Sequence, residues 1–284
     1  GDWSSDVCSS DLVDSVRARL VRSLDARAGV LGSAEVATYT AASEEALGRC
    51  AAILGKRRDC GALRRCHGDL HLGNIVLWKG APLAFDAIEF DEDLATIDPL
   101  YDLAFTLMDL VHRGHADHAT AVLNRYLWRR GVAALDDDTW SGLAALPLLI
   151  SLRAIVRAVV GVDRARTLDD PEKAAAVADA QRYLATANAA LAVEPARLVA
   201  VGGLSGTGKS TLARALAPGF GAVPGAIHLR TDLERKALLG VEETERVGPS
   251  GYTTEVTAAT YARLALKASL ALRAGYSVIT DAVF

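Results

Sequence analysis

The C-terminal third of the chain takes its fold from one glycine-rich stretch, Gly203-Leu204-Ser205-Gly206-Thr207-Gly208-Lys209-Ser210. It has the spacing G-x-x-x-x-G-K-[ST]. A strand-like apolar run precedes it at Leu198 to Val201, and a helical pattern follows it at Ser210–Leu216. Glycines let backbone N–H groups turn inward around a phosphate, and the start of the next helix adds partial positive charge. The stretch therefore predicts a P-loop; the alternative is a glycine-rich turn that binds nothing.

The P-loop interpretation assigns a nucleotide-binding role to eight residues. These are Gly203, Ser205, Gly206, Thr207, Gly208, Lys209, Ser210 and Thr211. Lys209 is expected to reach the β- and γ-phosphates of ATP, and Ser210 is expected to ligate Mg²⁺.

Two acids downstream complete this predicted site. Asp232 follows a second apolar run and could accept a proton from a substrate hydroxyl, although a helix cap is an alternative role. Asp281 ends a third run, Val278-Ile279-Thr280, where a Walker-B-type acid would help to hold Mg²⁺. Substrate contact and a plain strand-end cap are its alternatives. Strands that alternate with helices predict a parallel α/β sheet.

A second chemical stretch lies upstream, His67-Gly68-Asp69-Leu70-His71-Leu72-Gly73-Asn74. It has the spacing H-x-D-x-x-x-x-N, and Asp86 follows beyond a predicted hairpin. In phosphoryl transfer a protein mostly positions groups and neutralises charge. Asp69 would therefore act as the catalytic base, while Asn74 and Asp86 would hold Mg²⁺ through hard oxygen ligands. A polar loop without chemistry is the alternative.

The residues after this stretch predict a mostly helical module. Asp98-Pro99 predicts a helix start, with Asp98 as the N-cap and Pro99 at the first helical position. Further helical patterns cover residues 116–130, 138–163 and 171–191, and residues 193–196 read as a linker.

Together these motifs resemble a bacterial fusion of two modules. The stretch His67–Asn74 with Asp86 and Asp98–Ala104 is similar to the aminoglycoside phosphotransferase and choline-kinase-like family. Residues 197–284 resemble small P-loop kinases. The resemblance implies the large lobe of a protein-kinase-like fold over residues 13–192, followed by a P-loop NTPase sheet that is truncated at its C-terminus. It also implies ATP and Mg²⁺ as cofactors. The same resemblance implies that Asp102 braces the catalytic loop from the following helix; a surface acid near a helix start is the alternative.

The chain departs from that family before His67. Nothing there supplies a glycine-rich strand–turn–strand or a V-A-I-K-like lysine, so we expect the small lobe to be missing. We therefore expect a fragment that is inactive at Asp69. Residues 2–12 resemble a translated sequencing adapter, and residues 1–12 are left out of the fold argument.

Composition narrows the functional class. The net charge is −4, which argues against a nucleic-acid partner and against an anionic membrane. No apolar run reaches the roughly 18–20 residues that span a bilayer, and no export signal is seen, so a cytoplasmic location is expected. The three histidines at 112, 115 and 118 read as solvated helix-end residues rather than a metal site.

We therefore expect a phosphotransferase that acts on the alcohol group of a small molecule. One alternative is an NTP-dependent regulatory protein with a degenerate kinase module, and another is a nucleic-acid end kinase. The identity of the acceptor and the oligomeric state are not readable from the residues.

Overall fold

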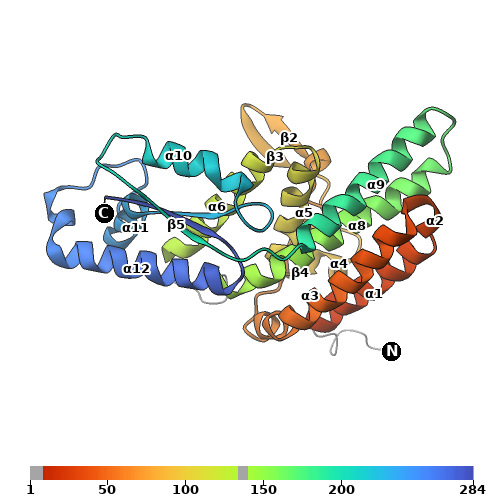
Figure 1. Ribbon diagram of the computed structural model, residues 1–284, viewed down its shortest axis with the longest axis horizontal. Helices are drawn as coiled ribbons and strands as arrows, with labels where there is room; N and C mark the ends of the chain where they lie inside the picture. Colours follow the sequence, from red (N-terminus) through yellow and green to blue (C-terminus); the bar gives the residue numbers. More distant parts are fainter. Residues whose placement is uncertain (1–8, 134–139, 284) are drawn as a thin grey trace. The chain divides into compact units, whose positions relative to one another are not determined.

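The computed structural model describes residues 9–133 and 140–283, which pack into two compact units (Figure 1). Unit 1 comprises residues 1–115 and 145–192, and unit 2 comprises residues 116–144 and 193–284. Much of the predicted adapter segment lies outside the described residues. The sequence analysis grouped residues 13–192 in one module, whereas the contacts place residues 116–144 with the P-loop unit.

Unit 1 is built mainly of helices. They are α1 (Ser9–Asp25), α2 (Ala28–Leu31), α3 (Ser33–Asp59), α5 (Pro99–His112), α8 (Leu146–Ala165) and α9 (Glu172–Leu191). Helix α8 packs against α5 and α9, and α3 packs against α1 and α9. Helix α3 starts at Ser33, and its buried face includes Val36 and Tyr39.

Helix α8 corrects one expectation from the sequence. With the preceding 3₁₀ turn it forms a helix, Gly142–Ala165, that is long and apolar enough to cross a membrane. In the sequence, Pro147 and Arg153 interrupt the apolar run that starts at Gly142. Pro147 instead lies in the first turn, where no N–H donor is required, and the Arg153 side chain is buried. Because 67% of the most apolar window is buried, α8 fits the core helix of a folded domain.

Short strands in unit 1 shape the predicted catalytic region. Strand β1 (Arg64–Arg65) pairs with β4 (Thr96–Ile97), which follows α4 (Glu92–Ala95). The 3₁₀ turn η1 (Leu72–Asn74) leads into β2 (Ile75–Trp78), which pairs antiparallel with β3 (Ala81–Ala84). The predicted hairpin is thereby confirmed.

The tip of the hairpin is a two-residue turn. Lys79 (φ 50°) and Gly80 (φ 79°) form the whole turn, and both occupy left-handed backbone conformations. Such a two-residue turn matches the twist of paired strands. Pro82 therefore lies in β3, opposite Leu77, and not in the turn.

Unit 2 contains a parallel sheet that, within the described residues, has the strand order β5-β7-β6. Its elements are α6 (Ala116–Ala133), β5 (Leu198–Gly202), α10 (Lys209–Leu216), β6 (Ile227–Arg230), α11 (Thr231–Leu239), α12 (Thr254–Arg273) and β7 (Val278–Ala282). Short 3₁₀ turns follow at Ala217–Gly219 and Pro249–Tyr252. Both strand pairs are parallel, as predicted, so the carboxyl ends of the strands meet at one edge.

Helix α6 covers the outer edge of β6 with side-chain hydrogen bonds. Asn124 Nδ2 donates to the carbonyl of Ala226 at 3.1 Å, and Asn124 Oδ1 accepts from the N–H of His228 at 2.7 Å. Thr120 Oγ1 donates to the carbonyl of Pro224 at 2.7 Å. One asparagine thus takes the place of a neighbouring strand and satisfies two edge groups.

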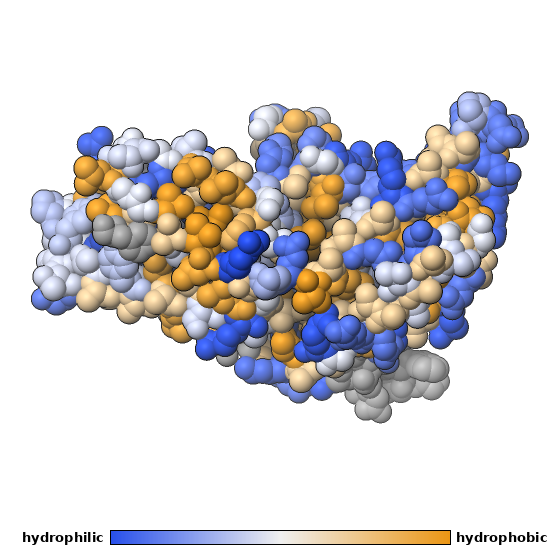
Figure 2. All heavy atoms as spheres, viewed as in Figure 1, coloured by the Kyte–Doolittle hydropathy of each residue, from blue (hydrophilic) through white to orange (hydrophobic). Residues whose placement is uncertain are grey.

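The opposite edge of the sheet carries apolar surface. In the described part of the chain β5 pairs with β7 alone. Leu198 of β5 and Leu212 and Leu216 of α10 are 55%, 51% and 46% exposed. Figure 2 shows hydrophobic side chains gathered over α10 and β5 on the face that it presents. Within unit 2, this edge therefore carries exposed apolar side chains.

Candidate functional site

The predicted catalytic loop brings two polar side chains, those of Asn74 and His71, to Asp69. Asn74 Nδ2 donates to Asp69 Oδ2 at 3.1 Å and to the Asp69 carbonyl at 3.0 Å. His71 Nε2 lies 3.4 Å from the same carboxylate oxygen. The side-chain nitrogen of Asn74 thus donates to Asp69. A cation ligand at this residue would therefore be the side-chain oxygen, Oδ1. The sequence analysis did not single out His71, whose Nδ1 also accepts from the N–H of Gly73.

The hairpin returns the chain to this loop at Asp86. The N–H of Phe85 donates to the carbonyl of Asn74 at 3.0 Å. His67 Nε2 lies 2.8 Å from the carbonyl of Phe85. Asp86 itself is exposed and has φ of 61°, a left-handed conformation that non-glycine residues adopt mostly where the surrounding structure requires it. The structure therefore places Asp86 directly after the residue that is bonded to Asn74.

Helix α5 holds the backbone of the catalytic loop from one face. Asp102 accepts from the N–H groups of His67 and Gly68, at 3.0 and 3.1 Å. Its predicted bracing role is confirmed. Two further α5 residues, which were not predicted from the sequence, also form hydrogen bonds to the backbone of the loop. Thr106 Oγ1 donates to the Leu70 carbonyl at 2.6 Å, and Asp109 Oδ2 accepts from the Leu72 N–H at 3.0 Å.

The spacing of these α5 residues in the sequence indicates that they act together. Positions 102, 106 and 109 are four and three residues apart, so they share one helical face. All three side chains are buried in a helix that is otherwise apolar. Buried polar residues need partners, and here the partners are backbone groups of the loop.

Arg153 of α8 closes the same loop from another side. Its Nη2 donates to the Gly68 carbonyl at 3.0 Å and its Nε donates to the Tyr101 carbonyl at 3.1 Å. The guanidinium carbon lies 3.7 Å from the centre of the Tyr101 ring. The loop is therefore pre-organised by hydrogen bonds from two helices.

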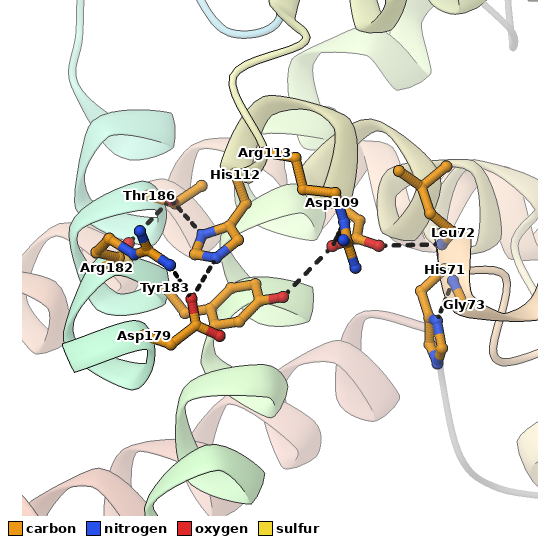
Figure 3. Close-up of polar contacts among 10 residues, drawn as sticks. All are labelled: His71, Leu72, Gly73, Asp109, His112, Arg113, Asp179, Arg182, Tyr183 and Thr186. Atoms are coloured by element: carbon orange, nitrogen blue, oxygen red, sulfur yellow. Dashed lines mark hydrogen bonds and ion pairs between the residues drawn. The ribbon is translucent and has the colours of Figure 1, made fainter. Parts of the chain in front are cut away.

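A polar network extends from the loop through α5 to α9 (Figure 3). The Tyr183 hydroxyl donates to Asp109 Oδ1 at 3.4 Å, and the His112 ring stacks on the Tyr183 ring with 3.5 Å between centroids. His112 Nε2 lies 3.0 Å from Asp179 Oδ1. The sequence analysis interpreted His112 as a solvated residue, which is wrong, because its side chain is 6% exposed and is bonded on both ring nitrogens.

The P-loop of unit 2 has the backbone that its glycines predict. Gly203, Gly206 and Gly208 have φ of 148°, 81° and 86°, and Gly208 caps the start of α10. The carbonyl of Leu204 accepts from Lys209 Nζ at 2.6 Å and from Thr207 Oγ1 at 2.8 Å. Backbone N–H groups beside glycines of positive φ, together with the start of a helix, form a partly positive surface of the kind that can bind phosphate.

Asp281 lies beside the P-loop serine. Asp281 is 4% exposed, and its register partner across the sheet is Arg230. Burial raises its pKa, but hydrogen bonds from His228 and Ser210 outweigh burial and hold the pKa below its ordinary value. The His228 Nε2 atom lies 2.8 Å from Asp281 Oδ2. Carboxylate and hydroxyl oxygens such as those of Asp281 and Ser210 are hard ligands of the kind that Mg²⁺ takes, usually together with several waters.

The other predicted residues of unit 2 are placed differently. Asp232 is exposed in the first turn of α11, where it pairs with Lys236 Nζ at 3.2 Å, and Arg230 holds the N-cap position. Arg235 is buried and donates to the Gly251 carbonyl. The structure thus brings Lys209, Ser210 and Asp281 to one edge, with Asp232 one turn beyond β6.

Comparisons with known proteins agree with both modules. A family model described as "Phosphotransferase enzyme family" matches residues 14–146, and a model described as "AAA domain" matches residues 198–284. No solved structure matches the chain.

Curated relatives come from mycobacteria. An uncharacterised protein of Mycobacterium bovis and an uncharacterised protein of Mycobacterium tuberculosis are each 38% identical over 219 residues. These matches cover 76% of this chain and 41% of each relative. The chain therefore spans less than half the length of these relatives. The predicted fusion is confirmed: the chain joins a domain of the phosphotransferase enzyme family to a C-terminal AAA domain of the P-loop kinase-like kind.

Proposed function

We propose that the protein is an ATP-dependent kinase that transfers phosphate to a hydroxyl group of a small molecule, with a second ATP-binding site in the P-loop unit. The observation that carries the proposal is that the chain has two separate candidate sites. In each of them a carboxylate oxygen and a neutral oxygen ligand lie beside a preformed loop. One consists of Asp69 and Asn74 with Asp86 following the hairpin, and the other consists of Ser210 and Asp281 with Lys209.

At the first site Asp69 would orient the acceptor hydroxyl and accept its proton. Its bond from Asn74 holds the carboxylate in place, and the braced loop keeps this geometry before substrate arrives. Asn74 and Asp86 would hold Mg²⁺, which neutralises charge on the ATP phosphates when it is bound.

At the second site the P-loop glycines and Lys209 would bind the phosphates, and Ser210 and Asp281 would hold Mg²⁺. Thr211, Ser205 and Thr207 belong to the same loop and helix start. Asp232, exposed beyond β6, is the candidate to accept a proton from a second acceptor.

We further propose that the 284-residue chain does not transfer phosphate at Asp69. The described residues before His67 are the helices α1 to α3 and the two-residue strand β1. They include no glycine-rich strand–turn–strand to cover adenine and phosphates. ATP binding to this chain should therefore depend on Lys209. We place the activity in the cytoplasm, where ATP is available.

The test uses two proteins. A longer protein that contains this sequence is screened with labelled ATP against aminoglycosides, sugars and nucleosides, with Asp69→Ala and Lys209→Ala in parallel. Loss of transfer in only one variant assigns that chemistry to its unit, while full transfer in both variants contradicts the proposal. For the 284-residue chain we expect Mg·ATP binding that Lys209→Ala weakens at least tenfold, with Lys173→Ala, on the exposed N-terminal turn of α9, as the matched control.

A further inference from the structure

The carboxylate of Asp281, a candidate Mg²⁺ ligand of the P-loop, has a histidine as a hydrogen-bond donor. His228 Nε2 lies 2.8 Å from Asp281 Oδ2, and the two side chains are 9% and 6% exposed. An ionised carboxylate only accepts hydrogen bonds, so the Nε2 atom must carry the hydrogen. His228 thereby engages Oδ2, and a cation ligand at Asp281 would be the other oxygen, Oδ1.

The strand register explains why these two side chains meet. In the parallel pair of β6 and β7, His228 is the register partner of Ile279, and Arg230 is the register partner of Asp281. Side chains two residues apart on a strand point to the same face of the sheet. His228 therefore shares a face with Arg230 and Asp281, one step back from the carboxyl end of the strands, and its ring reaches Asp281 along the strand direction.

Arg230 adds charge near this carboxylate without a hydrogen bond from its closest nitrogen. Arg230 Nε lies 3.8 Å from Asp281 Oδ2, which is beyond hydrogen-bonding distance, and it is buried without a hydrogen-bond partner among the described residues. An ion pair at this distance attracts the carboxylate but does not fix its orientation, whereas a hydrogen bond is directional. On the β6 side of Asp281, the orientation of the carboxylate therefore depends on His228.

Helix α6 fixes the part of the backbone that carries His228. Asn124 Oδ1 accepts from the His228 N–H at 2.7 Å, and Asn124 Nδ2 donates to the Ala226 carbonyl at 3.1 Å. These two hydrogen bonds hold the outer edge of β6 on either side of Ile227. A side chain that orients a metal ligand needs a fixed backbone of this kind.

We propose that His228 is a positioning residue of the P-loop site, which holds the Asp281 carboxylate in the orientation in which it can bind Mg²⁺ together with Ser210. The Ser210 hydroxyl hydrogen-bonds to this carboxylate, so the two candidate ligands are adjacent. His228 acts through Asp281 and is not itself a ligand. A residue that supports a metal ligand in this way typically contributes about 10–100-fold to metal affinity. The inference rests on the proposed nucleotide site.

The test is isothermal titration calorimetry of the full chain with the non-hydrolysable ATP analogue AMP-PNP, once in excess Mg²⁺ and once in EDTA. His228→Leu removes the donor and keeps the bulk of the side chain. We expect its affinity in Mg²⁺ to fall at least about tenfold. The affinity in EDTA should change less than about twofold, because the P-loop amides and Lys209 bind phosphate without the metal.

Two control variants accompany this measurement. His228→Gln places an amide N–H donor close to the position of Nε2, so it should retain the affinity in Mg²⁺ to within about threefold. His115→Leu makes the same substitution at an exposed residue of unit 1 and should leave both affinities unchanged.

A double-mutant comparison shows whether His228 acts through Asp281. In an Asp281→Ala background the carboxylate that His228 holds is gone. His228→Leu should then lower the affinity in Mg²⁺ by less than about twofold, because the two substitutions remove the same interaction. A full further loss in that background would show that His228 does not act through Asp281, and would overturn the proposal.

Equal affinity of His228→Leu and the unmodified chain in Mg²⁺ would overturn the positioning role and leave the P-loop site intact. A loss of the same size in Mg²⁺ and in EDTA would also overturn it, because a disturbed strand explains that result. If His228→Leu does not fold, His228→Asn decides: its shorter amide cannot reach Asp281, so it must show the loss in Mg²⁺ alone. If the unmodified chain does not bind AMP-PNP, or if Lys209→Ala does not weaken binding, the P-loop assignment is contradicted and the positioning role falls with it.

Discussion

Cys66 lies directly before the catalytic loop, and its surroundings suppress thiol ionisation. Burial raises its pKa to about 11, and the carboxylates of Asp102 and Asp98 act in the same direction. Burial also raises the pKa of Cys50 to about 11. Cys60 is exposed. The thiolate is the reactive species, so these environments predict an order of reactivity.

At pH 8 only about 0.1% of a thiol with a pKa near 11 is ionised. We therefore expect iodoacetamide to modify Cys60 at least tenfold faster than Cys50 or Cys66. Peptide mass spectrometry over a time course measures the rates. Raising the pH toward 10 should narrow the gap, because the thiolate fraction of the two suppressed cysteines rises. Equal rates at pH 8 would contradict the assigned environments.

The α5 braces make a second residue-level prediction. Asp102→Asn replaces an acceptor oxygen with an N–H group that cannot accept from the His67 or Gly68 amide. A hydrogen bond to a charged group contributes about 1.5–3 kcal/mol, so amide exchange at His67 and Gly68 should accelerate at least tenfold. Asp109→Asn should instead accelerate amide exchange at Leu72, whose N–H donates to Asp109. Hydrogen exchange followed by mass spectrometry distinguishes the two. A uniform increase across the chain in both variants would instead indicate general destabilisation.

At the level of elements, Asp98 joins α3 to the start of α5. It caps α5 by accepting from the Leu100 N–H at 2.9 Å. It also binds Arg57 of α3 through two hydrogen bonds of 2.6 and 2.8 Å, with both side chains buried. The sequence predicted the cap from Asp98-Pro99, but Arg57 is 41 residues away and carried no local signal.

Removal of one partner from a buried ion pair costs about 3–5 kcal/mol, because the other charge stays buried. Asp98→Ala should lower the free energy of unfolding by this amount. Asp98→Asn, which keeps an acceptor for the cap, should cost about 1 kcal/mol less. Urea unfolding measures both. If Asp98→Ala costs as much in an Arg57→Ala background as in the unmodified chain, the two residues are not coupled.

At the scale of the whole molecule, the chain crosses between its two units more than once. Helix α6 precedes α8 in the sequence but packs with the P-loop sheet, where Asn124 and Thr120 satisfy the edge of β6. A division of the chain at the predicted linker, residues 193–196, would leave that edge uncovered.

We therefore expect residues 193–284 alone to be at least 2–3 kcal/mol less stable than a chain in which residues 116–144 are joined to them, because edge groups and apolar surface lose their cover. Circular dichroism during thermal unfolding compares the two. The joined chain with Asn124→Ala should fall between them. Identical melting temperatures for all three would show that α6 contributes nothing to unit 2.

The motifs and the local structure around them follow from the sequence itself. The P-loop, the hairpin after Asn74, the Asp98-Pro99 helix start and the parallel strands depend on nearest neighbours in the chain, and each was readable from residue types and spacing. The packing partners were not. The structure pairs groups that are distant in sequence: Asp98 with Arg57, Asp281 with His228, His112 with Asp179, and the P-loop sheet with α6. Short-range periodicity carries no information about such contacts, because they form only when the elements pack and buried polar groups find their partners.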